Sequence, residues 1–123
     1  MRIQFSAGFA DSSRVTAEKI QPLYSAFQND LELEEELSGF VIGLAEDVDL
    51  IQDAETAGSL PDVGTRARHL AKRAERLGYG LLTQIASEVV TASDEDKPEV
   101  VQTHLRALTH VACRIRRGHR GAA

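Results

Sequence analysis

The chain has 123 residues, a length that suits one compact domain. Its residues are 42% hydrophobic and 27% charged, as in ordinary globular proteins, and no apolar run reaches the roughly 18 residues of a membrane span, so we expect no membrane partner. The single cysteine, Cys113, excludes an internal disulfide and favours a reducing compartment, so we predict a cytoplasmic protein.

Charge is unevenly divided along the chain, although the net charge is only −5. Residues 1–62 contain 13 acidic and 3 basic side chains, whereas residues 63–123 contain 6 acidic and 11 basic ones. The commoner explanation is that helix faces of opposite sign attract each other within the fold. The alternative is a basic surface that recruits an acidic partner. Nucleic acid is not the expected partner, because the total charge is acidic and aromatic residues are few.

The N-terminal half begins with a segment that lacks a sustained hydrophobic period. We interpret residues 1–20 as an N-terminal extension rather than a signal peptide. After a turn at Asn29-Asp30, a long amphipathic helix is predicted over about residues 31–56. We expect Gly39 and Gly43 within it to let another helix approach closely. Its apolar stripe consists of Leu33, Leu37, Phe40, Leu44, Val48 and Ile51.

Three further helices are predicted in the C-terminal half. The second helix covers about residues 63–77, and Gly78 and Gly80 end or kink it. The third begins near Leu81, and the fourth follows a turn with Pro98 in its first turn. Their apolar stripes are Val63, Ala67, Leu70, Ala74 and Leu77; then Leu82, Ile85, Ala86, Val89 and Val90; then Val101, Leu105, Leu108, Ala112 and Ile115.

Four helices that each have one apolar stripe to bury predict an all-α fold. We expect an antiparallel, up-down four-helix bundle over residues 21–117, followed by a basic, frayed tail at residues 118–123. Nothing in the sequence indicates the oligomeric state.

Motifs for metal or cofactor chemistry are missing from the sequence. It has no glycine-rich phosphate loop, no cysteine pair with metal spacing, and no Glu-x-x-His pair of a di-iron bundle. We therefore expect no metal and no cofactor. Cys113 lies beside the last apolar stripe without an orienting group, so we expect a small buried hydrophobic residue rather than a nucleophile.

The basic stretch "RARHLAKRAERLGYG", residues 66–80, separates into two faces on a helix with 100° per residue. His69 lies near the middle of the exposed face, where a neutral imidazole can attack a phosphoryl group. An ordinary surface histidine is the simpler interpretation. The buried arc contains Ala67, Leu70, Ala71, Ala74 and Leu77. The exposed arc contains Thr65, Arg66, Arg68, His69, Lys72, Arg73 and Arg76.

The segments "PLYSAF", "LSGFVIGLAEDVDLIQDAETAG", "ARHLAKRAERLG" and "LLTQIASEV" together resemble a histidine-containing phosphotransfer (Hpt) domain, over about residues 20–117. The similarity is to a bacterial branch of that family, in which a Tyr-Gly pair and a later Thr follow the motif. Hpt domains are four-helix bundles that carry a phospho-accepting histidine on the second bundle helix, in a motif of the form A-H-x-L-K-G.

Two alignments with that motif are possible. Without a gap, Leu70, Leu77-Gly78 and Thr83 match, and Arg68 takes the acceptor position. Ala71 and Lys72 then replace the family's Lys and Gly. A shift of one residue makes His69 the acceptor and Lys72 the accessory lysine, but it places Ala71 on the family's Leu and needs a deletion before Leu77. We favour the ungapped alignment.

The resemblance implies a protein of two-component signalling. The favoured form is a degenerate module, without enzymatic activity, that docks on a receiver domain of a response regulator or on a histidine kinase. Its docking residues would be Arg68, Lys72, Arg73 and Arg76. The alternative is an active phosphotransfer intermediate that carries phosphate on His69 to a receiver aspartate. A helical interaction domain unrelated to signalling is the third possibility.

Overall fold

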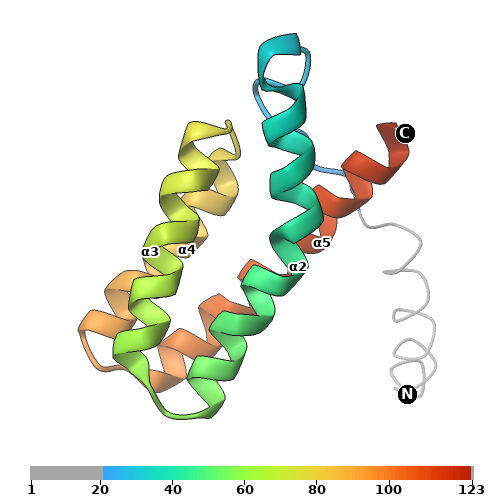
Figure 1. Ribbon diagram of the computed structural model, residues 1–123. Helices are drawn as coiled ribbons and strands as arrows, with labels where there is room; N and C mark the ends of the chain where they lie inside the picture. The colour runs from blue at the N-terminus through green and yellow to red at the C-terminus, as the bar shows by residue number, and fades with distance from the viewer. Residues whose placement is uncertain (1–20, 123) are drawn as a thin grey trace, which may run out of the picture.

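The computed structural model describes residues 21–122, with side chains up to His119, and the predicted N-terminal extension lies outside this range. The described residues form a short 3₁₀ helix and four α-helices, and no strand (Figure 1). The predicted all-α class is therefore confirmed for this part of the chain. The elements are η1 (Leu31–Leu33), α2 (Glu34–Thr56), α3 (Leu60–Arg76), α4 (Gly80–Asp94) and α5 (Pro98–Ala122).

The four helices contact one another around a common core. Each helix packs on its neighbour in the sequence, and α2 also packs on α5, so the contacts form a closed ring with α3 and α5 diagonally opposite. The predicted stripes supply this core. Every predicted stripe residue is buried except Leu33 and Val90, which are partly buried and pack against it.

Local sequence signals explain where the helices begin and end. The Asp30 side chain accepts a hydrogen bond from the Glu32 N–H (3.0 Å) and caps the 3₁₀ turn that leads into α2. Gly78 follows α3 with a φ of +82°, a conformation that favours glycine. Gly80 is the first residue of α4 rather than the end of α3. Pro98 begins α5, as predicted.

Two predictions about individual residues are wrong. Cys113 is exposed, because Val111, Ala112 and Ile115 take the inward positions of α5 and turn its side chain toward solvent. Gly39 and Gly43 do not accommodate another helix of the described chain. A Cβ atom added at either position meets nothing within 4 Å.

Residues 21–30, which we call the strap, cross one end of the bundle. The Leu23 N–H donates to the Arg114 carbonyl on α5 (2.9 Å), and the Ala26 N–H donates to the Gly78 carbonyl (2.9 Å). α5 continues to Ala122, and Gly118 lies so close to the strap that a Cβ there would be 2.8 Å from the Leu23 carbonyl oxygen. The strap thereby ties the end of α5 to the link between α3 and α4.

Candidate functional site on the outer face of α3

The outer face of α3 is a row of polar side chains on the second helix of the bundle. All of its members are exposed, whereas the opposite side of the helix is buried, as the sequence predicted. The 3.6-residue period alone accounts for this division, since small and aliphatic residues recur on one side. The outer face comprises Thr65, Arg66, Arg68, His69, Lys72, Arg73 and Arg76.

The edge of this face next to α2 is neutralised by carboxylates. Arg73 lies 3.0 Å from an oxygen of Asp47, and its guanidinium also covers the Phe40 ring at 5.2 Å from the centroid. Arg76 donates to both oxygens of Glu36, at 3.0 and 2.8 Å. These contacts bear out the interpretation that the acidic and basic halves attract each other within the fold. Each such pair is exposed and contributes at most about 1 kcal/mol.

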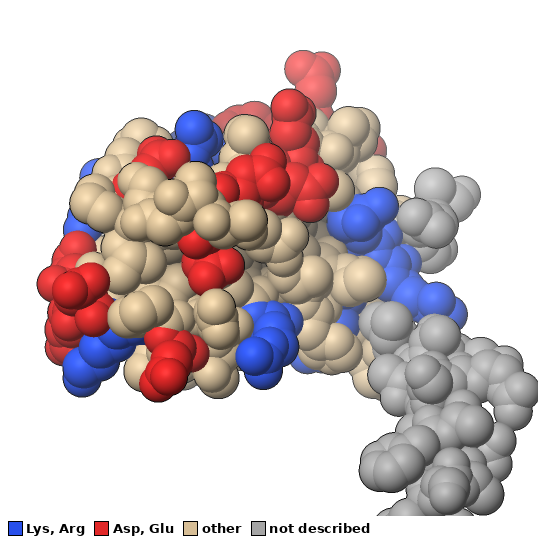
Figure 2. All heavy atoms as spheres, turned by 90° about the horizontal axis from the view of Figure 1, so that it is seen from below, with Lys and Arg blue, Asp and Glu red and all other residues tan. Residues whose placement is uncertain are grey.

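The edge next to α4 also carries an ion pair. Arg68 lies 3.5 Å from Asp94, the last residue of α4, while Arg66 pairs with Asp62 one turn earlier on α3 at 3.3 Å. Acidic and basic side chains lie interspersed on the end of the bundle seen in Figure 2. Of the candidate docking residues, Arg68, Arg73 and Arg76 are thus held by acids on neighbouring helices.

The centre of the outer face differs from its edges. His69 and Lys72 are exposed, and among residues 21–119 neither makes a side-chain hydrogen bond or an ion pair. In a catalytic pair, a third group such as a carboxylate orients the base. No carboxylate among residues 21–119 orients the His69 imidazole in this way. The structure therefore places Arg68, His69 and Lys72 together on one surface, with only Arg68 fixed by a partner.

A second feature, at the strap-covered end, was not predicted from the sequence. Tyr79, which the sequence presents as the centre of "GYG" and as the tyrosine of the Tyr-Gly pair in the resemblance, lines a cavity of about 290 Å³. Other walls come from the strap, α2 and the end of α5. Because Tyr79 and the end of α5 are distant in the sequence from the strap and α2, no local pattern could have indicated the cavity.

The described residues define a four-helix bundle with a polar outer face on α3. Scans of protein-family models, curated proteins and solved structures find no match to this chain. Between residues 21 and 122, no helix is long and apolar enough to cross a membrane. The same residues contain no group of three or more His, Cys, Asp or Glu side chains that could hold a metal ion.

Proposed function

We propose that this chain is an Hpt-type signalling protein that docks, through the outer face of α3, on a receiver domain or histidine kinase. The closed ring of four helices and the short links between them support the antiparallel, up-down topology that the resemblance implies. The observation that carries the proposal is the grouping of Arg68, His69 and Lys72 on the exposed side of the second bundle helix.

The module is degenerate in this proposal because Arg68 stands in the acceptor position. A guanidinium remains protonated at physiological pH and, unlike a neutral imidazole, has no free lone pair with which to attack a phosphoryl group. It can instead attract the acidic phosphorylation pocket of a receiver domain. The Asp94 carboxylate, 3.5 Å away, holds Arg68 at the α4 edge, whereas Lys72 at the centre makes no ion pair with any of residues 21–119.

Docking is tested by titrating the protein with a receiver domain at low and high salt. We expect binding that weakens with salt and that is lost in Lys72→Glu, since rim charges act mainly through long-range attraction. Arg106→Glu is the matched control, because Arg106 is exposed on α5, diagonally across the ring. If both variants lose the same affinity, the loss is due to total charge and not to Lys72. If the protein binds neither a receiver domain nor a histidine kinase, the docking proposal is wrong, and the third possibility, a helical domain unrelated to signalling, is the one that remains.

A second candidate function is phosphotransfer through His69. It is favoured by the exposed imidazole, which has no hydrogen-bond partner among the described residues and is open to an incoming phosphoryl group. In this reaction an imidazole nitrogen attacks the phosphorus of an aspartyl phosphate, a P–N bond forms, and the P–O bond to the carboxylate breaks. Lys72, one turn further along α3, would then contact the transferred phosphate.

The two candidates separate in one assay. The protein is incubated with a phosphorylated receiver domain, and acid-labile, alkali-stable phosphate on the chain is measured. Phosphate that is absent from His69→Ala but present in His110→Ala, a variant at an exposed histidine of α5, would establish transfer through His69. Receiver binding without such phosphate is the result that the degenerate module predicts.

A further inference from the structure

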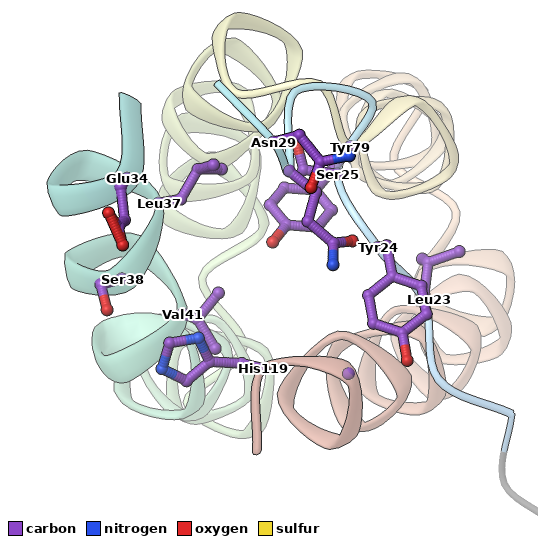
Figure 3. A pocket seen from close by; sticks show the side chains of 12 residues that line it. Leu23, Tyr24, Ser25, Asn29, Glu34, Leu37, Ser38, Val41, Tyr79 and His119 are labelled. Carbon is purple, nitrogen blue, oxygen red and sulfur yellow. The ribbon is translucent and has the colours of Figure 1, made fainter. Parts of the chain in front are cut away.

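The cavity at the strap-covered end has the build of a small-molecule site. Its volume of about 290 Å³ lies near the lower limit of ligand pockets. Leu23, Leu37 and Val41 give it apolar walls, and Glu34 and Ser38 lie along its α2 edge (Figure 3). None of its lining residues belongs to the outer face of α3, so the cavity is a separate place on the molecule from the proposed docking surface.

Tyr79 supplies the observation that points to a ligand. Its side chain is only 6% exposed, its hydroxyl points into the cavity, and that hydroxyl makes no hydrogen bond within residues 21–119. Burial raises the pKa of the phenol above its ordinary value of 10, so the group stays protonated and can donate. The hydroxyl oxygen is not sealed from solvent, since among the described residues only the Ser93 hydroxyl is both fully buried and without a partner, so the Tyr79 hydroxyl can donate to a polar group bound in the cavity.

The ring of Tyr79 is fixed in this position. It stacks on Phe40 at 5.6 Å between centroids, with the planes inclined by 23°. Phe40 is in turn covered by Arg73, which is held by Asp47. The hydroxyl is therefore presented in a preorganised direction, which lowers the entropic cost of binding.

The charge of the walls selects the ligand. Among the described residues that line the cavity, Glu34 is the only Asp or Glu, and none is a Lys or Arg. Glu34 is exposed at the mouth and makes no ion pair with another described residue. A cation with an apolar body would satisfy the carboxylate and the apolar walls together, and a second polar group would reach Tyr79.

We propose that this cavity binds a small primary amine that carries a second hydrogen-bonding group, such as a phenolic amine or an amino alcohol. The ammonium group pairs with Glu34 at the mouth. The hydroxyl of the ligand meets the hydroxyl of Tyr79 inside, and the apolar body lies against Leu37 and Val41.

The test uses the full chain and three probes of one shape. Tyramine carries both polar groups, phenethylamine lacks the hydroxyl and 4-ethylphenol lacks the ammonium. Amide chemical shifts are followed by NMR during titration to millimolar concentrations. We expect saturable shifts at Tyr79, Leu37 and Ser38 with tyramine, and affinities at least about fivefold weaker with the other two probes, since each lacks one hydrogen bond or ion pair.

Variants locate the two polar contacts. Tyr79→Phe keeps the ring and its stacking on Phe40, and we expect it to weaken tyramine about five- to tenfold while leaving phenethylamine unchanged. Glu34→Gln should weaken both amines but not 4-ethylphenol. Glu32→Gln is the control, because Glu32 is exposed on the 3₁₀ turn and does not line the cavity.

Three results would overturn the proposal. The first is an absence of saturable shifts at the cavity with tyramine, which would leave only water in contact with Tyr79. The second is equal affinity for all three probes, which would mean that the cavity takes up any apolar body. The third is nuclear Overhauser contacts in the full chain between residues 1–20 and Tyr79 or Leu37, because the chain itself would then occupy the cavity.

Discussion

The strap-covered end of the bundle and the outer face of α3 are built in opposite ways. At the end, backbone and side-chain atoms of the strap come so close to Gly78 and Gly118 that neither position has room for a Cβ atom. On the outer face, long charged side chains lie in solvent and contact carboxylates at their edges. Substitutions at the end should therefore change folding stability, whereas substitutions on the face should leave the fold intact and change what it binds.

The largest effect is expected at Gly78. In Gly78→Ala, the new Cβ would be 2.9 Å from both Phe27 and the Ser25 hydroxyl and 3.1 Å from the Ala26 nitrogen, at a backbone φ of +82°. We expect the free energy of unfolding to fall by about 2–3 kcal/mol, measured by urea denaturation.

Gly58 provides the matched control for that substitution. It has a similar φ of +79°, but a Cβ at this position meets nothing within 4 Å. Gly58→Ala should therefore cost only the backbone strain, about 1 kcal/mol. Equal losses in the two variants would mean that the strap does not press on Gly78 in solution.

The sequence predicts the helices and their buried faces better than it predicts the contacts at the strap-covered end. Apolar residues recur with the helical period, so the buried side of α3 and the exposure of His69 follow from local spacing. The helical period defines the direction of a buried face only to within about one residue. The sequence therefore predicts Cys113 on the buried side of α5, whereas its side chain is exposed. Val111, which the predicted stripe omitted, is buried instead.

Local spacing does not predict contacts between segments that are distant in the sequence. The charge asymmetry predicted attraction between the two halves, but it could not pair Arg73 with Asp47 or Arg76 with Glu36. Those pairs depend on how α2 and α3 are rotated against each other. The cavity depends on the strap, whose path is fixed by hydrogen bonds to Arg114 and Gly78.

An intermediate effect is expected at Ser25, which fastens the strap. Its buried hydroxyl donates to the Leu77 carbonyl and accepts from the Phe27 N–H at 2.8 Å. Ser25→Ala removes both bonds and leaves the carbonyl without this donor, so we expect a loss of about 1–2 kcal/mol of unfolding free energy. Amide hydrogen exchange should become faster in residues 23–27. Ser87→Ala, at an exposed position of α4, should change stability by less than about 0.5 kcal/mol.

The smallest effect is expected on the outer face of α3, at Arg76. Arg76→Gln removes the contacts with both oxygens of Glu36, yet the two side chains are 64% and 48% exposed. Solvent and salt screen such a pair, so the variant should lose at most about 0.5 kcal/mol of unfolding free energy, and less at high salt.

Arg106→Gln, which breaks no ion pair among the described residues, is the control and should show no salt-dependent loss. A loss above about 1.5 kcal/mol in Arg76→Gln would show that this edge stabilises the bundle as the strap does. In that case only the centre of the outer face, at His69 and Lys72, would tolerate substitution without a loss of stability.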